Sequence, residues 1–155
     1  MKRILFLFAA MLLILTGCGG EEEKVKISPK EFESRVSEAL SQMDTIYKRV
    51  SSTENEDGTY TIMVSNNAGF VIDGNKVTAS HLFPYDRDDV IQLFTILIGC
   101  VDDSLSLGER NLVINELGLR GNINLMDYTK VIHHNDIMYT VHGNNDAVLL
   151  KAEIK

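Results

Sequence analysis

Histidine is the residue type in this sequence that could most directly do chemistry, because neutral imidazole is a common metal ligand. Of the four histidines, His133 and His134 are adjacent, and His142 follows within the same expected hairpin. A two-residue turn at 135–136 would pair His134 with Ile137. This register points His133 and His134 to opposite sheet faces and leaves His142 roughly 13 Å along the strand. A three-ligand site would need another register or His81, so we predict polar hairpin residues and no metal site.

The two cysteines, Cys18 and Cys100, are the other candidates for chemistry. Cys100 lies late in the apolar run 90–101, where burial and the negative end of a helix both raise the pKa of a thiol. Reactive cysteines need the opposite surroundings. We therefore predict that Cys100 packs in the core. If Cys18 is covalently modified, no disulfide can form inside the domain.

The clustered aspartates are interpreted as residues at helix ends. Asp86 is a candidate N-cap, and Asp88 and Asp89 fall in the first helical turn, where the helix dipole favours negative charge. Asp102 and Asp103 come near the other end of that helix. They lack the alternating oxygen ligands and the twelfth-position glutamate of a calcium-binding loop.

No catalytic motif is found along the chain. The sequence has no glycine-rich phosphate loop, no serine nucleophile elbow and no HExxH pair. It has no tryptophan, and its five tyrosines are dispersed. We therefore predict a protein that is not an enzyme and that uses no cofactor.

The first 17 residues have the three-part layout of a secretory signal. Lys2 and Arg3 form a positive start, residues 4–15 form an apolar run, and Thr16-Gly17 are small. The apolar run is too short to span a bilayer as a helix of the mature protein.

The tetrapeptide Leu15-Thr16-Gly17-Cys18 resembles the lipobox of bacterial lipoproteins: an aliphatic residue, two small residues and a cysteine. The resemblance implies that the Cys18 sulfur receives a diacylglyceryl group. It also implies cleavage of the signal peptide 1–17 and acylation of the new amino terminus by a fatty acid such as palmitate. Gly19 follows the cysteine where an aspartate would imply retention at the inner membrane, which favours the outer membrane in a host that has one. The alternatives are a secretory signal with an incidental cysteine and an uncleaved anchor.

Residues 18–27 are predicted to form a lipidated tether, and residues 28–155 a single globular domain. The nine residues 19–27 extend at most about 30 Å, so the domain stays near its membrane. Cleavage removes Lys2 and Arg3 from 15 basic residues and none of the 22 acidic ones, which leaves a formal charge of about −9. Such a charge disfavours nucleic acid and electrostatic adhesion to anionic lipid, so the lipid anchor must hold the protein at the membrane.

Two capping boxes and one apolar run predict three helices. The stretch 28–31 (SPKE) is a capping-box start, and apolar residues at three- and four-residue steps extend the predicted amphipathic helix over residues 29–50. The run 90–101 is apolar on nearly every side, which predicts a helix buried in the core. Residues 106–109 repeat the capping pattern and predict a helix over 107–117, with Gly118 as its left-handed cap.

Six strands are predicted, and apolar residues alternate with polar ones in three of them, near 60–64, 137–141 and 148–154. Three lie near 60–64, 70–72 and 76–82, with an Asp73-Gly74 hairpin turn, and three lie near 130–133, 137–141 and 148–154. Residues 51–58 are predicted to form a polar loop. The order α-βββ-αα-βββ, with short turns between strands, predicts a two-layer α+β domain whose mainly antiparallel sheet carries helices on one face.

The expected anchor and the missing catalytic motifs together predict a non-enzymatic binding or interaction module of the cell envelope. It would be lipid-anchored to the outer side of the cytoplasmic membrane or to the outer membrane. One sheet face, or the loops 66–69 and 143–146, would meet an envelope protein. The alternatives are binding of a small apolar or lipid ligand between sheet and helix, and a metal-dependent or thiol enzyme.

Overall fold

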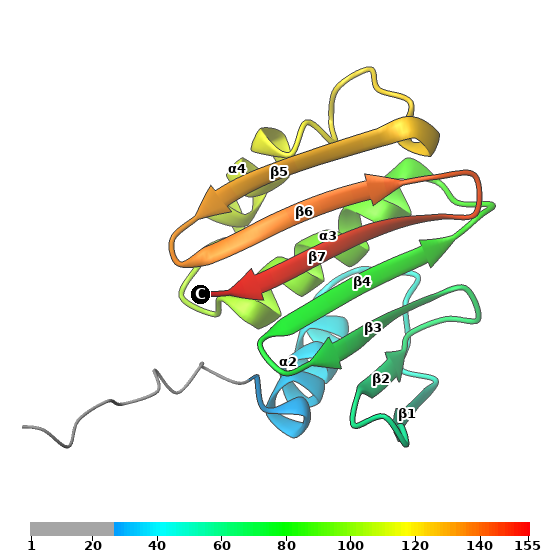
Figure 1. Ribbon diagram of the computed structural model, residues 1–155, viewed down its shortest axis with the longest axis vertical. Helices are drawn as coiled ribbons and strands as arrows, with labels where there is room; N and C mark the ends of the chain where they lie inside the picture. The colour runs from blue at the N-terminus through cyan, green and yellow to red at the C-terminus, as the bar shows by residue number, and fades with distance from the viewer. Residues whose placement is uncertain (1–26) are drawn as a thin grey trace, which may run out of the picture.

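The computed structural model describes residues 27–155, so the predicted signal peptide and nearly all of the tether, with Cys18, lie outside the described residues. Helices α2 (Pro29–Gln42), α3 (Arg87–Val101) and α4 (Leu107–Glu116) and the short 3-10 helix η1 (Leu125–Asp127) accompany seven strands (Figure 1). The strands are β1 (Ser51–Glu54), β2 (Tyr60–Met63), β3 (Ala68–Asp73), β4 (Lys76–Leu82), β5 (Tyr128–His134), β6 (Ile137–Gly143) and β7 (Ala147–Ile154).

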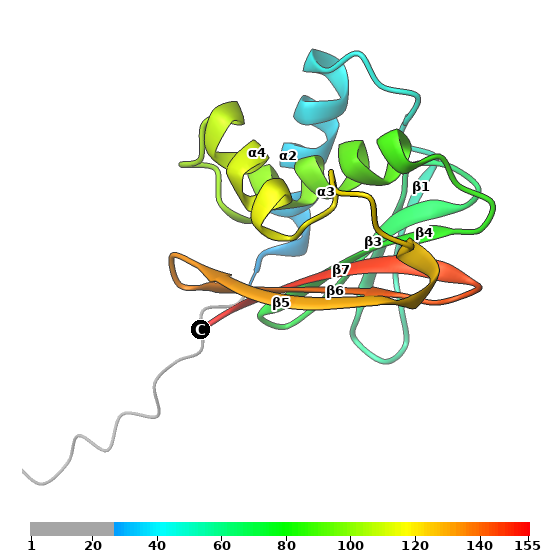
Figure 2. The same ribbon diagram turned by 90° about the horizontal axis from the view of Figure 1, so that it is seen from above.

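The seven strands form one antiparallel sheet in the order β1-β2-β3-β4-β7-β6-β5. The last strand, β7, lies in the interior of the sheet and joins the meander β1–β4 to the hairpin β5–β6. The described helices all lie on one face of the sheet, and no helix of residues 27–155 lies on the other face (Figure 2). This arrangement confirms the predicted two-layer α+β fold.

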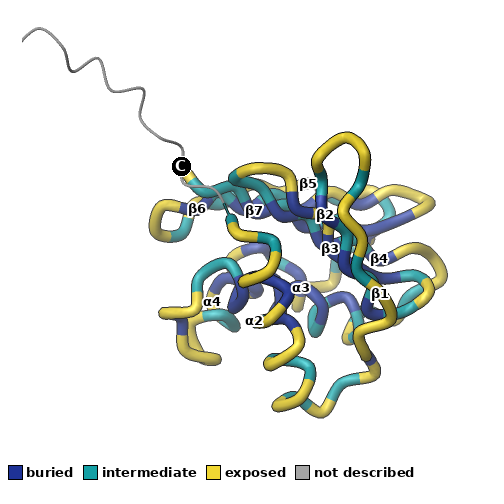
Figure 3. The backbone as a smooth tube through the Cα atoms, turned by 90° about the horizontal axis from the view of Figure 1, so that it is seen from below, coloured by how far each residue is buried: buried dark blue, intermediate teal, exposed yellow. Residues whose placement is uncertain are grey.

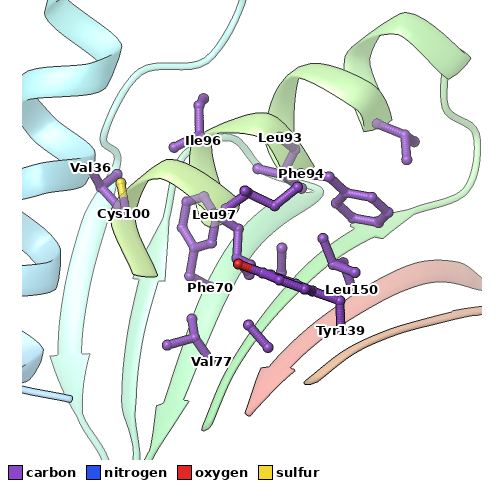
Figure 4. Close-up of a cluster of buried hydrophobic side chains, with 14 of the residues drawn as sticks. Val36, Phe70, Val77, Leu93, Phe94, Ile96, Leu97, Cys100, Tyr139 and Leu150 are labelled. Atoms are coloured by element: carbon purple, nitrogen blue, oxygen red, sulfur yellow. The ribbon is translucent and has the colours of Figure 1, made fainter. Parts of the chain in front are cut away.

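Helix α3 lies across the sheet and supplies the centre of the core. Nine of its residues are buried, and Leu93, Phe94 and Leu97 face buried side chains of the sheet, among them Phe70 and Leu150 (Figure 4). The buried part of the chain is concentrated where the sheet and the helices face one another, whereas turns and outer helix surfaces are exposed (Figure 3). Because α3 is apolar on nearly every side, it is covered both by the sheet and by the other helices.

The capping predictions agree with the observed helix starts. The Ser28 side chain accepts a hydrogen bond from the Glu31 amide, and the Asp86 side chain accepts one from the Asp88 amide. Ser106 and Glu109 form a complete capping box at the start of α4. Gly118 follows α4 with φ +74°, the left-handed conformation predicted for it.

Helix α2 ends at Gln42, whereas the apolar spacing predicted a helix as far as residue 50. Met43 is extended, and the chain beyond it runs beside β2, where the Lys48 amide donates to the Val64 carbonyl at 2.9 Å. Tyr47 is buried, but Ile46 and Val50 are exposed. The predicted helix is therefore wrong beyond residue 42. The three- and four-residue spacing of apolar residues continues there by coincidence, in a segment whose backbone amides pair with the chain at the end of β2 as in a strand.

The first strand lies inside the predicted polar loop 51–58. Residues 51–54 (SSTE) pair with β2 over four positions as an edge strand. None of these residues is buried, so the segment has no apolar alternation from which a strand could be predicted.

Candidate functional site

The predicted loops 66–69 and 143–146 both lie at one end of the sheet, although Ala68 and Gly69 belong to β3 and Gly143 ends β6. The Asn67 carbonyl accepts a hydrogen bond from the Leu82 amide, and the Asp146 carbonyl accepts one from the Phe83 amide, each at 2.8 Å. The turn 64–67, the end of β4 and the turn 144–146 are therefore neighbours. We call this region, residues 64–67, 82–85 and 144–146, the loop end; it lies on the right in Figure 1.

Two large apolar side chains are exposed at the loop end. Leu82 is 48% exposed and Phe83 is 53% exposed. The Phe83 ring packs edge-on against Tyr85, which in turn packs against the buried ring of His81, with centroid distances of 6.0 Å in both pairs. The next ring inward is Tyr47, 6.2 Å from His81. An exposed phenylalanine is thus supported by a continuous aromatic row that reaches the core.

A cavity of about 260 Å³ lies beside Phe83. It is lined by Phe83, Tyr85, Arg87, Ile123, Asn124, Leu125 and Met126. The Arg87 guanidinium holds the segment 121–126 in place on the side of the cavity opposite Phe83, because it donates hydrogen bonds to the backbone carbonyls of Gly121 and Ile123. Gly143 permits the close approach of η1, because a Cβ at that position would clash with the Leu125 carbonyl oxygen.

The chain enters the described domain at the opposite end of the sheet. The Ile27 amide donates to the Gly74 carbonyl at 3.0 Å, in the turn between β3 and β4. The amide of Lys155, the last residue, donates at 3.0 Å to the Asp136 carbonyl, in the turn between β5 and β6. We call this region, residues 27, 73–75, 135–136 and 154–155, the tether end; the C-terminus marks it on the left in Figure 1.

The histidine register is as predicted. His134 pairs with Ile137, and His142 lies five pairs further along the ladder, opposite Thr129, whose hydroxyl is 3.0 Å from the His142 Nδ1. His81 is buried on the helix side near the loop end, with Nδ1 3.0 Å from the Leu82 carbonyl oxygen. Within residues 27–155, no three His, Cys, Asp or Glu side chains are grouped so that they could hold a metal ion.

Cys100 is buried in the core, and burial raises the pKa of its thiol to about 12. Its backbone carbonyl accepts a hydrogen bond from the Arg35 guanidinium at 3.1 Å. Because a thiol attacks as its thiolate, these surroundings suppress reactivity at neutral pH.

The aspartates beyond α3 bind neighbouring segments. Burial alone would raise the pKa of Asp102, but hydrogen bonds from Ser104 and Asn135 outweigh it and lower that pKa. The Asn135 bond ties the end of α3 to the β5–β6 turn. Asp103 pairs with Arg35 at 3.1 Å, which joins the same region to α2.

A buried polar cluster that sequence reasoning missed joins α2 to the first two strands. Glu33 accepts hydrogen bonds from the Tyr60 hydroxyl at 2.6 Å, from the Ser52 hydroxyl at 2.8 Å and from the Arg49 guanidinium. Lys30 donates to the Tyr60 oxygen at 2.9 Å. The hydrogen bond from Tyr60, followed by that from Ser52, lowers the pKa of Glu33.

We call this cluster the Glu33 clasp; it consists of Lys30, Glu33, Arg49, Ser52 and Tyr60. Its geometry indicates a structural role, in which it holds α2 against β1 and β2. Its central carboxylate and phenol are nearly covered by protein and already hydrogen-bonded within the cluster. The sequence of α2 does not predict the Glu33 clasp, because Glu33 is one glutamate in an amphipathic pattern and its partners lie 16 to 27 residues away.

A second hollow separates α2 from the ends of α3 and α4. It measures about 240 Å³ and is lined by Arg35, Glu38, Ala39, Gln42, Met43, Gly99, Cys100, Asp103 and Arg110. The Arg110 guanidinium lies against Gly99, where a Cβ would clash with it, and the Arg110 Nε donates to the Leu105 carbonyl. Two guanidiniums face two carboxylates here, so the lining has no excess of either charge.

None of the helices described in residues 27–155 is long and apolar enough to span a membrane. The chain matches no protein-family model, no curated protein and no solved structure in the comparisons made with them.

Proposed function

We propose that this protein is a lipid-anchored, non-enzymatic binding module of the bacterial cell envelope, whose loop end receives a protein partner. One observation carries the proposal: the two loops and the exposed Phe83 lie together at the end of the sheet opposite Ile27, where the chain enters the domain. A lipid at Cys18 would hold the tether end close to the bilayer. The loop end would then face away from it.

The dimensions are consistent with this orientation. Strand β4 has seven residues and runs from the tether end to the loop end, which separates the two ends by roughly 20–25 Å. The tether adds at most about 30 Å. The loop end would therefore lie within a few tens of ångströms of the membrane surface, within reach of a membrane-associated protein but not of a distant one.

The composition of the loop end suits protein recognition. Binding energy at protein interfaces is concentrated in a few well-supported, often aromatic side chains surrounded by polar residues that exclude water. Phe83 has that support from Tyr85, and its surroundings include the exposed side chains of Asn66, Asn144 and Asn145. The hydrogen bonds between the loops and β4 fix this surface before a partner arrives, which lowers the entropic cost of binding.

The test has two arms. In native cells, Cys18→Ala should move the protein from the membrane to the soluble fraction while its circular dichroism stays unchanged. Phe83→Ala should reduce crosslinking to an envelope protein at least tenfold, and Val131→Ala should leave crosslinking within twofold. Val131 is a matched control because it is 50% exposed and lies on the outermost strand, β5. Membrane retention of Cys18→Ala, or equal effects of the two alanine variants, would contradict the proposal.

The alternative of an apolar ligand between the sheet and α3 gains no support from a specific observation. That space is occupied by side chains, among them Phe70, Leu97 and Tyr139 (Figure 4). The hollows described above lie instead between helices and at the loop end.

A further inference from the structure

Three aspartates form an acidic rim in and beside the loop end: Asp146 belongs to the loop end, and Asp86 and Asp127 adjoin it. All three aspartates are exposed. The Asp146 carbonyl accepts a hydrogen bond from the Phe83 amide, and Asp86 follows Phe83 by three residues. Asp127 is next in the chain to Met126, which lines the cavity. Arg87, the cation in the cavity wall, already donates to two backbone carbonyls. Among residues 27–155, the exposed Lys48, whose amide donates to the Val64 carbonyl, is the other cation beside the loop end, so the three carboxylates outnumber the two cations.

The tether end of the same sheet has a different charge balance. Lys76 and Lys151 both approach Glu153, at 3.9 Å and 3.5 Å, and Lys155 ends the chain beside Asp136. Asp73, at the end of β3, is also there, so three lysines stand beside three carboxylates. The loop end, where three carboxylates stand beside Arg87 and Lys48, has the more acidic balance.

We infer that the segment recognised at the loop end carries one large apolar side chain flanked by lysine or arginine. The apolar side chain would enter the 260 Å³ cavity beside Phe83, and the flanking cations would meet Asp86, Asp127 and Asp146. This inference rests on the proposed function, because it names the chemistry of the partner at the same surface.

The size and charge of the site favour this occupant over others. A cavity of about 260 Å³ is smaller than the 300–1,000 Å³ typical of small-molecule sites, but it suits one side chain. Phosphate-rich polymers and anionic headgroups would be repelled by the three carboxylates. Complementary rim charges mainly accelerate association and select the partner, whereas the buried apolar anchor sets the lifetime of the complex.

The experiment uses the full lipidated chain in its native host. Benzoylphenylalanine replaces Phe83 in one variant and Val131 in the other, and mass spectrometry locates each photo-crosslink. We expect the crosslink from position 83 to fall in a protein segment with a large apolar residue and at least two lysines or arginines within four positions. A crosslink from position 83 to a neutral or acidic protein segment would overturn the inference and leave the proposed function intact. A crosslink to lipid alone, or none to protein, would overturn both.

Charge reversal supplies a matched second measurement. Asp146→Lys, in the benzoylphenylalanine variant at position 83, should lower the crosslink yield by about threefold to tenfold, because rim charges control association. Asp136→Lys makes the same charge change in an exposed turn at the tether end and should alter the yield by less than twofold. Equal losses in the two variants, or no loss with Asp146→Lys, would overturn the charge assignment.

Discussion

Two buried tyrosines offer a direct test of the packing, because they differ in one respect. Tyr47 and Tyr139 are each at most 1% exposed, and burial raises the pKa of both phenols. The Tyr47 hydroxyl donates to the Asp89 carbonyl at 2.8 Å. The Tyr139 hydroxyl is the buried side-chain polar atom without a hydrogen-bond partner in residues 27–155. Removing the two hydroxyls should therefore change the free energy of unfolding in opposite directions.

The magnitudes follow from the cost of an unmade hydrogen bond. A buried hydroxyl without a partner costs about 1–3 kcal/mol, so Tyr139→Phe should raise the free energy of unfolding by about 1 kcal/mol after allowance for a small void. Tyr47→Phe loses a formed hydrogen bond and should lower the free energy of unfolding by about 0.5–1.5 kcal/mol. The two variants should thus differ by roughly 2 kcal/mol.

Urea denaturation at pH 7, followed by far-UV circular dichroism, measures this difference. The midpoint should rise for Tyr139→Phe and fall for Tyr47→Phe at an unchanged m-value, because both substitutions leave the exposed surface of the unfolded chain nearly the same. A destabilisation of Tyr139→Phe by 1 kcal/mol or more would refute the reasoning, since it would mean that the hydroxyl forms a favourable hydrogen bond in the folded protein.

Three further outcomes are expected. Glu33→Gln should destabilise the domain by about 1.5–3 kcal/mol at pH 7, the range for hydrogen bonds to charged groups. The pKa of Glu33 is lowered in the folded state, so its contribution to the free energy of unfolding is present above its unfolded pKa of about 4.5 and is lost as the pH falls through the folded pKa. The difference in free energy of unfolding between wild type and Glu33→Gln should therefore shrink in acid. A larger difference in acid would contradict the Glu33 clasp. Cys100 should react with a disulfide reagent at pH 8 no faster than the domain opens, and rapid native-state labelling would refute its burial. Mass spectrometry of protein from its native host should find a diacylglyceryl group on Cys18 at the amino terminus, and an unmodified sulfur there would remove the anchor.

Local signals predicted most of the fold. Capping residues placed the starts of α2 and α4 within a residue, and period-two alternation indicated β2, β6 and β7. The hairpin register around the histidines also followed from local reasoning, because a two-residue turn fixes the pairing of both strands. These features depend on residues that are near neighbours in the chain.

Features set by distant partners were not predictable in this way. The end of α2 is decided by pairing with β2, and β1 exists because β2 offers an edge, although its own residues have no apolar alternation. The Glu33 clasp likewise needs Ser52 and Tyr60, which a single helical pattern cannot reveal. In each case a segment's neighbour in space, and not its own sequence, decides its structure.

The loop end depends on the least local feature of the topology. The turn 144–146 approaches the turn 64–67 only because β7 pairs with β4 along seven positions, from Lys76–Glu153 to Leu82–Ala147. The sequence identified both hairpins but contained no local signal for the order in which they join. The same pairing places Phe83 against Asp146, whereas Ile27 lies at the other end of the sheet through its own bond to the Gly74 carbonyl in the β3–β4 turn. One interior strand therefore joins the turn 144–146 to the rest of the loop end, and a function that uses both turns requires β7 to be in place.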